Sequence, residues 1–512
     1  MNKRFAAFAN LTFSLAGLGF NIVSGLFFVP LYLRHIDDGT YGAWLASGGV
    51  ISMLGLVESG LSTVLTQKLA AAIGANDKNR FAILSVTGAG TAAFVGFGVA
   101  ILGSLVAVVA PPLFGCPSEQ LGRMRVAIVL SALGSGAMML SYSLGAVAQA
   151  LQQTIRQGVV VLLAMASGVG VIWSGFNLGL GVVSFGCGSL CVGLVMLAGN
   201  QLNKQLLWRK FDLPRRRFNS GIRNELWQDA RSLLLTKVSS AVASNLQSPA
   251  AALTVSPEAS TVLALTSRVL SLVPMLADRI GSAVFAGVAH LSQRSAKERD
   301  DCLREILTIT TVVSGLGIGL AVCFTKPLVI LWVGERRYAG DLVLWILVGS
   351  SFLGIRQAAY SNMLIALGEI RSAAWWMAAD SVLRLALLLL LAPLFRLSGI
   401  PTANLIASGI VAVGLATLLV KCTKLAHTSI WFSGAMGFIL CLCFGLAWSR
   451  WLPRPATWVQ LAWQGSTCVV CMLILTVAFD CGWRRALLRN LQVLTARTTF
   501  STAARTAARR SA

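Results

Sequence analysis

The sequence predicts an all-α polytopic membrane protein, because its composition is apolar and long apolar runs recur along it. Hydrophobic residues make up 56% of the 512 positions and charged residues only 12%, about half the charged fraction of a soluble domain. The runs are close to the ~20 residues that span a bilayer core, whereas β-barrel strands alternate in segments of about ten residues. We expect about fourteen transmembrane helices, at residues 11–33, 42–65, 82–110, 124–149, 157–174, 178–199, 232–254, 260–290, 306–333, 342–367, 373–394, 400–420, 430–449 and 458–479.

The placement of basic residues predicts the orientation of these helices. The chain carries 42 Lys and Arg against 19 Asp and Glu, a formal net charge of +23. With the N-terminus inside, about 28 of the basic residues fall in cytoplasmic segments and about 8 in outside loops, which is the bias of the positive-inside rule. Because the number of spans is even, we expect both termini in the cytoplasm.

The spans fall into two halves separated by a basic segment. Residues 200–231 form the longest hydrophilic stretch, with eight Lys or Arg against three acids. We interpret it as a linker on the anionic leaflet, where each basic residue contributes about 1 kcal/mol; nucleic-acid binding is the alternative that we do not favour. The predicted organisation is an N-terminal six-helix lobe (1–199), a basic cytoplasmic linker (200–231), a C-terminal six-helix lobe (232–425), two additional transmembrane helices (426–480) and a basic cytoplasmic tail (481–512).

The two halves share an order of features that suggests a repeat. After the fourth span comes AQALQQTIRQG, from residue 148, and after the tenth comes LIALGEIRSA, from residue 364. Both contain an Ala-Leu pair, a short polar turn and an Arg, and Ala150 then matches Ala366 at an offset of about 216 residues. Because each repeat holds an even number of spans, the repeats would have the same orientation, related by an axis along the membrane normal.

No residue pattern indicates an enzyme. The eleven cysteines are scattered, and the three histidines are far apart in sequence, so that neither set forms a cluster with metal-ligand spacing. The sequence also lacks a Walker loop, a dinucleotide fingerprint and a nucleophile elbow. We therefore predict no catalytic residue, no metal site and no cofactor.

Ionisable residues inside the predicted spans are the main functional signal. A charge at the bilayer centre costs about 2.5–3.5 kcal/mol, so such side chains normally face a bundle interior or a wet cavity. Lys326 and Lys237 lie close enough to a span end to reach the interface, and Asp380 and Arg384 are spaced to pair with each other. The nine residues are Glu58, Lys237, Arg268, Asp278, Arg279, Lys326, Arg356, Asp380 and Arg384.

The bases among these residues predict an anionic ligand. Arg268 and Arg356 each lie many residues from either end of a span, with no acid three or four positions away. The six bases among the nine residues all lie in the second half, so a central cavity would be cationic on one wall. Such a wall suits a multivalent anion, and phosphate or diphosphate fits because Arg is its preferred planar partner. We assign substrate binding to Arg268, Arg356, Lys237 and Arg384.

Glu58, in LGLVESGL, is the only acid within the spans of the first half. Aligning Gly60 with Gly281 places Glu58 opposite Arg279, with Asp278 beside it. Equivalent helices of two repeats face each other across the central axis, so this acid and base would form a latch at the inner mouth. We assign gating or ion coupling to these three charges; local pairing of Glu58, or its contact with water at the inner leaflet, is the alternative.

The stretch PLYLRHIDDGTYGAWLASGGVISMLGLVESGL, residues 30–61, resembles the second-span signature of Wzx-type O-antigen flippases. These are polysaccharide-biosynthesis transporters of the multidrug/oligosaccharidyl-lipid/polysaccharide (MOP) superfamily. The order of spans is similar over roughly residues 1–425. The matching residues are Pro30, Leu33, Gly39, Tyr41, Gly42, Trp44, Gly55, Leu56, Gly60 and Leu61.

The resemblance implies transport of an undecaprenyl-diphosphate-linked oligosaccharide from the inner to the outer leaflet of the bacterial inner membrane by alternating access. The diphosphate would lie on the basic wall, the sugars in the wet cavity and the polyprenyl tail in lipid. The resemblance is also compatible with coupling of transport to H⁺ or Na⁺, for which Glu58 is the candidate in the first half. It is compatible, too, with a partnership with the polysaccharide polymerase machinery.

Three other functions compete with this interpretation. A multidrug antiporter of the same superfamily would need a cavity rich in acids and aromatics for cationic drugs, and the bases argue against it. A membrane-embedded glycan polymerase or ligase would need a large outside loop with catalytic residues, and the outside loops are short. A non-transporting scaffold would leave the intramembrane charges without a purpose.

Overall fold

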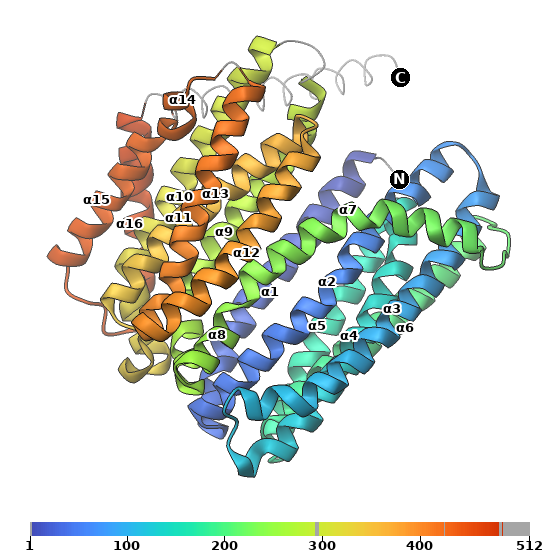
Figure 1. Cartoon of the computed structure of the whole chain (residues 1–512), viewed down its shortest axis with the longest axis horizontal. Helices are drawn as coiled ribbons and strands as arrows, with labels where there is room; N and C mark the ends of the chain where they lie inside the picture. The colour runs from blue at the N-terminus through green and yellow to red at the C-terminus, as the bar shows by residue number, and fades with distance from the viewer. Residues whose placement is uncertain (1–2, 292–295, 424, 481–483, 485–512) are drawn as a thin grey trace, which may run out of the picture. The chain divides into compact units, whose positions relative to one another are not determined.

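The computed structural model describes residues 3–291, 296–423, 425–480 and 484. Helices are the regular elements of these ranges, which confirms the all-α class for the described chain (Figure 1). Three short 3₁₀ helices are η1 (Ser118–Gln120), η2 (Glu335–Arg337) and η3 (Arg396–Ser398). The α-helices are α1 (Lys3–His35), α2 (Asp38–Gly74), α3 (Lys78–Leu113), α4 (Leu121–Ala150), α5 (Thr154–Asn177), α6 (Val183–Lys210), α7 (Ser220–Asn245), α8 (Gln247–Thr254), α9 (Pro257–Leu291), α10 (Ala296–Val333), α11 (Asp341–Ala366), α12 (Ile370–Phe395), α13 (Gly399–Cys422), α14 (His427–Phe432), α15 (Ala435–Trp451) and α16 (Trp458–Phe479).

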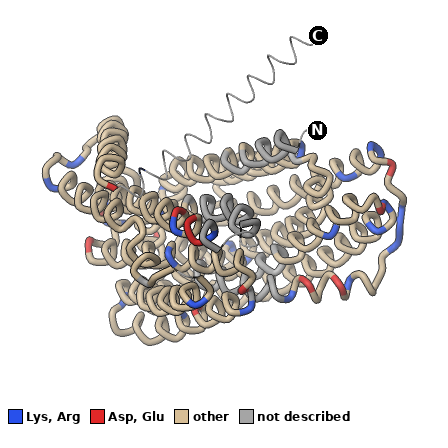
Figure 2. The backbone as a smooth tube through the Cα atoms, turned by 90° about the horizontal axis from the view of Figure 1, so that it is seen from above, with Lys and Arg blue, Asp and Glu red and all other residues tan. Residues whose placement is uncertain are grey.

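The chain is a polytopic membrane protein by the length and composition of its helices. Ten segments of the described residues are long and apolar enough to cross a membrane, and one of them, 371–422, contains both α12 and α13. The predicted spans 42–65 and 260–290 fall on α2 and α9, which are long helices outside these ten segments. Most positions along the chain are occupied by uncharged residues, and several of the charged residues lie in turns between helices (Figure 2).

The predicted span 232–254 is wrong as one continuous helix. The chain bends at Leu246, which separates α7 from α8. Pro249 explains the break, because its ring would collide with the carbonyl of Asn245 in an uninterrupted helix and it has no N–H to donate. The helix therefore ends at Asn245, and Pro249 lies in the first turn of α8, where a missing N–H costs little.

The helices form two compact units. The first comprises the described residues up to 264 together with 380–400, and the second comprises the remaining described residues. The first unit therefore extends beyond the six helices that the sequence assigns to the N-terminal lobe. It also takes in α7, α8, the first residues of α9 and the second half of α12.

Close backbone approach organises the first unit. Helix α4 packs most extensively against α6 and α3. A Cβ atom added at Gly96 of α3 would lie 2.6 Å from the carbonyl oxygen of Gly136, and one added at Gly193 of α6 would lie 2.3 Å from that of Gly134. Small residues are how membrane helices gain van der Waals contact, since lipid supplies no hydrophobic force to drive them together.

In the second unit, α10 is the central helix. It packs against α11, α15 and α16, and a buried cluster that includes Cys323, Cys441 and Met472 joins the three elements α10, α15 and α16. The Cys323 thiol donates to the carbonyl oxygen of Gly445 at 2.9 Å. The two additional helices that the sequence predicts are thus packed onto the rest of the second unit rather than standing apart.

The two sequence segments that suggested a repeat form the same kind of turn. After α4, the N–H of residue 152 donates to the carbonyl three residues earlier at 3.0 Å, and the N–H of residue 153 donates to the carbonyl five residues earlier at 2.8 Å. After α11, the N–H groups of residues 368 and 369 make the same two bonds, at 3.1 and 2.9 Å. Gln152 and Gly368 both have positive φ, +56° and +94°. This is the Schellman arrangement of a helix end. It occurs at both positions related by the offset of 216 (368 − 152), but also at other helix ends of the chain, so the repeat stays a prediction.

The predicted linker 200–231 differs from the structure, because most of it is helical and packed on the first unit. Residues 200–210 end α6 and residues 220–231 begin α7. Leu213, Leu226 and Ala230 are buried in the same cluster as residues of α2 and α3. Phe218 and Trp227 remain exposed and are free to meet a membrane surface.

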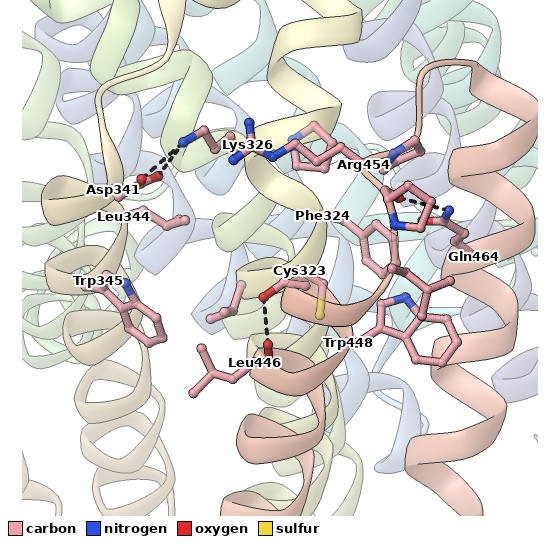
Figure 3. Close-up of a pocket in the computed structure, with 16 residues that line it drawn as sticks. Cys323, Phe324, Lys326, Asp341, Leu344, Trp345, Leu446, Trp448, Arg454 and Gln464 are labelled. Atoms are coloured by element: carbon pink, nitrogen blue, oxygen red, sulfur yellow. Dashed lines mark hydrogen bonds and ion pairs between the residues drawn. The ribbon is translucent and has the colours of Figure 1, made fainter.

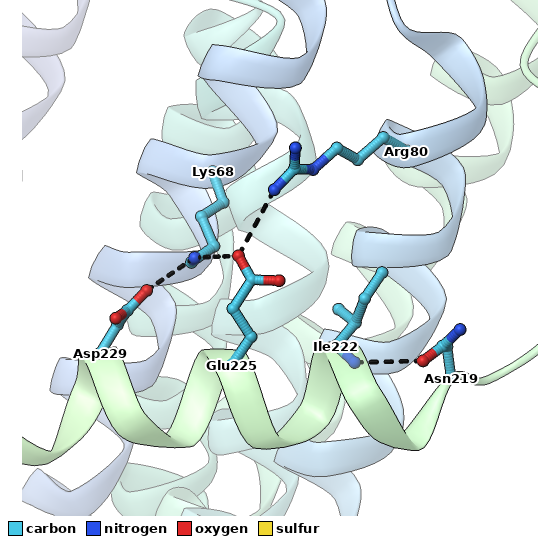
Figure 4. Close-up of polar contacts among 6 residues, drawn as sticks. All are labelled: Lys68, Arg80, Asn219, Ile222, Glu225 and Asp229. Atoms are coloured by element: carbon cyan, nitrogen blue, oxygen red, sulfur yellow. Dashed lines mark hydrogen bonds and ion pairs between the residues drawn. The ribbon is translucent and has the colours of Figure 1, made fainter.

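An ion cluster holds the start of α7 against α2 and α3 (Figure 4). Lys68 Nζ lies 2.5 Å from Glu225 Oε1 and 2.6 Å from Asp229 Oδ2, and Arg80 lies 3.4 Å from the same oxygen of Glu225. Burial alone would lower the pKa of Lys68, but its hydrogen bonds to Asp229 and Glu225 outweigh this and raise the pKa above its usual value. The acids of the segment thus bind it to the first unit, while most of its bases stay exposed.

We expect Gly96→Ala to destabilise the first unit by about 1–3 kcal/mol, because the new methyl group must displace the backbone of α4. Gly98→Ala on the same helix is the matched control, since a Cβ there has no atom within 4 Å. The melting temperatures of the purified variants in detergent test this. Equal melting temperatures for the two variants would contradict the close approach.

Candidate functional site

The signature stretch begins α2 with a side-chain cap. Asp37 Oδ2 accepts from the backbone N–H of Thr40 at 2.7 Å, and Asp37 Oδ1 accepts from the Thr40 hydroxyl at 2.6 Å. An Asp at the N-cap satisfies donors that the first turn of a helix leaves free. The polar turn between the two apolar runs therefore sets where α2 starts.

Two glycines of this stretch allow α2 to touch the start of α9. A Cβ atom at Gly42 would lie 1.8 Å from the carbonyl oxygen of Pro257, and one at Gly39 would lie 2.9 Å from a carboxylate oxygen of Glu258. Thr261 donates to the carbonyl oxygen of Asp38 at 2.7 Å. The residues that carry the family resemblance thus form a tight contact between α2 and the first residues of α9, and this contact lies within the first unit.

Aromatic residues of the same stretch pack beside this contact. Trp44 stacks on Phe185 of α6 with ring centroids 5.1 Å apart, and Tyr32 lies edge-on to the same ring at 4.8 Å. Tyr32 also stacks on Phe176 of α5 at 5.2 Å. The cluster fixes the ends of α1 and α2 against α5 and α6.

Arg356 and Asp380 are the two most completely enclosed charges among the described residues, and Arg356 is the one without an ionic partner there. Its side chain is 1% exposed. The guanidinium donates to the hydroxyl of Tyr360 at 2.8 and 3.1 Å, to that of Thr311 at 2.5 Å, and to the backbone carbonyls of Ile430 and Trp431. It therefore joins α10, α11 and α14 inside the second unit.

The prediction that Arg356 lines an open cavity differs from this geometry. All its acceptors are neutral protein groups, two of them carbonyls at the end of α14, where a helix leaves acceptors unsatisfied and favours a cation. Tyr360 is four residues from Arg356, so helical spacing alone predicts that the two side chains can meet. Thr311 and the α14 carbonyls come from distant segments, so sequence spacing gave no sign of them.

An apolar cavity of about 440 Å³ lies next to this group. Thr311, which accepts from Arg356, and Trp431, whose carbonyl does so, both contribute to its wall. The remaining lining residues are Phe352, Thr428, Phe432, Ala435, Phe438 and Ile439. The cavity suits a hydrocarbon chain rather than a sugar, because its walls are almost entirely aromatic and aliphatic.

Arg268 has the opposite environment to Arg356. Its side chain is exposed on α9, and among the described residues no group accepts a hydrogen bond from its guanidinium. Only its backbone carbonyl takes part in a side-chain contact, accepting from Ser271 at 2.7 Å. The donors of this guanidinium are thus not used by any group of the described residues.

Asp380 and Arg384 form the helical pair that their spacing predicted. Arg384 Nε donates to Asp380 Oδ2 at 2.8 Å, and both side chains are buried. Asp380 Oδ1 has no hydrogen-bond partner among the described residues. Arg384 is therefore neutralised by its own helix in this conformation.

The other predicted site residues fall where side chains are not described. Glu58 lies in α2, Lys237 in α7, and Asp278 and Arg279 in α9, but their side chains lie outside the described part of the structure. Their roles in binding, gating or ion coupling stay predictions.

Solved structures with this fold exist at low sequence identity. A multidrug resistance MATE family transporter of the MOP superfamily, in an inward-facing conformation, matches with a TM-score of 0.64 and 15% identity over 82% of this chain and 99% of that one. The lipid II flippase MurJ, in an inward closed conformation, matches with a TM-score of 0.63 and 12% identity over 91% and 99%. A MOP superfamily transporter from Pyrococcus furiosus, described by a binding pocket of reverse polarity, matches with a TM-score of 0.58 and 14% identity over 83% and 98%.

The chain therefore has the fold of the MOP superfamily transporters. The comparisons agree with the predicted fold, while membership of the superfamily and of the Wzx subfamily stay predictions. A scan of the sequence against family models and a search of curated proteins both find no match.

We expect the two arginines to differ in their effect on stability. Arg356→Ala should lower the free energy of unfolding by about 2–4 kcal/mol, because it leaves buried hydroxyl and carbonyl groups unsatisfied. Arg268→Ala should change it by no more than about 0.5 kcal/mol, as surface substitutions usually do. Denaturant titration of the purified variants measures both, and equal losses would contradict the assignment.

Proposed function

We propose that this protein is a lipid-linked oligosaccharide flippase. It moves an undecaprenyl-diphosphate-linked glycan from the inner to the outer leaflet of the bacterial inner membrane by alternating access, in cell-surface polysaccharide synthesis. Its fold is shared by a lipid II flippase and by multidrug transporters, so the fold alone does not choose the substrate. The choice comes from the charges and cavities of this chain.

The exposed guanidinium of Arg268 is the observation that carries the proposal. An arginine in a predicted span, with no acceptor among the described residues, is costly unless it faces water or a ligand. Its planar fork matches a phosphate in two hydrogen bonds. We propose that Arg268 binds the diphosphate and that Lys237 adds positive charge. Arg384 would add charge only when its pair with Asp380 opens, and Arg356 positions α14 rather than touching substrate.

The apolar cavity supports a lipid-linked substrate. A multidrug antiporter and a flippase both need a polar path, but only the flippase must also keep a long hydrocarbon chain out of water. The cavity of about 440 Å³ beside α14 and α15 supplies an apolar surface for part of such a chain.

Arg268→Ala should lower transport at least tenfold, since one hydrogen bond to a charged group is worth about 1.5–3 kcal/mol. Arg268→Lys should keep part of the activity because the charge remains and the fork is lost. Arg371→Ala, at another exposed arginine, is the control. The measurement is the exposure of an undecaprenyl-diphosphate-linked oligosaccharide at the far face of proteoliposomes.

Two outcomes of that experiment would sink the assignment. Full activity of Arg268→Ala would remove the diphosphate site. Efflux of a cationic dye that depends on a cation gradient, with no movement of the lipid-linked glycan, would favour the antiporter.

We also propose that Glu58 and Arg279 form a latch that closes the inner mouth. Glu58→Gln and Arg279→Gln should each impair transport, because loss of one partner shifts the inward and outward populations by a coupling energy of about 1–3 kcal/mol. The exchange Glu58→Arg with Arg279→Glu should restore part of it. An exchanged protein as inactive as the single variants, with no crosslink between cysteines at positions 58 and 279, would instead favour Glu58 as the H⁺ or Na⁺ coupling group.

A further inference from the structure

A second cavity, of about 200 Å³, lies where α10, α11, α15 and α16 meet (Figure 3). Its polar lining includes Lys326, Asp341, Arg454 and Gln464, and its apolar lining includes Trp345 and Trp448. All these residues belong to the second unit. The two additional helices supply one wall, so the cavity is complete only because α15 and α16 pack on α10.

The charges in this cavity leave one base uncompensated. Lys326 Nζ is paired with Asp341 at 3.1 Å, and Asp341 also accepts from the hydroxyl of Tyr338 at 2.8 Å. Arg454 points toward this pair (Figure 3), but among the described residues no acceptor lies within hydrogen-bonding distance of its guanidinium. Two bases against one acid give a net charge of about one positive unit, which attracts an anion.

The backbone at Arg454 is restricted before any ligand arrives, while its side chain is exposed. It lies between Pro453 and Pro455, whose rings restrict the backbone on both sides. The Gln464 amide donates to the carbonyl oxygen of Pro453 at 3.3 Å, which ties this turn to α16. A residue whose backbone is already restricted loses less freedom on binding than one in a mobile loop.

A buried donor in the same wall also lacks a partner. The indole Nε1–H of Trp448 has no hydrogen-bond acceptor among the described residues. Buried indole N–H groups usually find an acceptor. An acceptor-rich group that entered beside Arg454 would supply one after a small rotation of the ring.

The surroundings place this cavity at a membrane surface. Trp345, Trp451 and Trp463 lie in the end turns of the lining helices and are exposed, Trp451 to 85%. Tryptophan is enriched at the level of lipid headgroups, and Lys326 reaches out of the end of an apolar helix as a snorkelling side chain does. A headgroup is therefore the anion that the cavity meets at the highest concentration.

We propose that this cavity binds the phosphate of an anionic membrane phospholipid, with Arg454 as the main contact and Lys326 beside it. The bound lipid would hold α15 and α16 against α10 and α11. This lipid site would exist whatever substrate the protein carries.

Thermal unfolding of the purified full-length protein in detergent tests the site. Dioctanoyl phosphatidylglycerol should raise the melting temperature in a saturable way, and dioctanoylglycerol, which lacks the phosphate, should not. Arg454→Gln should weaken the apparent affinity roughly tenfold, the factor expected for one hydrogen bond to a charged group. Arg450→Gln, one turn earlier and outside the cavity lining, should bind as the unchanged protein does.

Three results would overturn the proposal. Equal stabilisation by dioctanoylglycerol would show that only the acyl chains matter. An equal loss in Arg450→Gln would show a general effect of surface charge. Inorganic phosphate alone giving the same Arg454-dependent shift would assign the site to free phosphate instead of a lipid headgroup.

Discussion

The cost of taking a charge out of water governs where the ionisable side chains of this protein lie. The described charges within apolar helices are stabilised by different kinds of partner. Arg356 uses neutral hydroxyl and carbonyl acceptors from three helices, whereas Arg384 uses an acid one turn away. Lys326 reaches the helix end to meet Asp341. Arg268 alone among these four has no described acceptor for its guanidinium, and that contrast makes it the candidate for an external anion.

The second constraint is the distance between helix backbones. In lipid, helices gain little from burying apolar side chains and depend on close contact instead. Gly96 and Gly136 allow such close contact between α3 and α4, and Gly42 allows it where α2 touches the start of α9. The family-like stretch is thus informative about packing, because Gly42 lies where only a hydrogen atom fits and the aromatic residues pack beside this contact.

Arg356 attaches the segment before the additional C-terminal helices to the rest of the second unit. Through the carbonyls at the end of α14, it ties the segment that leads into α15 and α16 to α10 and α11. Both described cavities lie along these helices, one apolar and one cationic. The additional pair is therefore a part of the second unit that builds binding surfaces.

The sequence by itself determined the all-α membrane class, the Asp380–Arg384 pair and the matching turns after residues 150 and 366. These features depend on composition or on residues within a few positions of one another, so periodicity and spacing are sufficient to read them. Only the tertiary structure decided that Arg356 is enclosed while Arg268 is exposed, although the two looked alike in their spans. It also decided that residues 200–231 fold onto the first unit and that Arg454 comes to lie beside Lys326. The reason is physical: the partners of these groups lie tens to more than a hundred residues away, and burial is a property of the assembled helices rather than of any one of them.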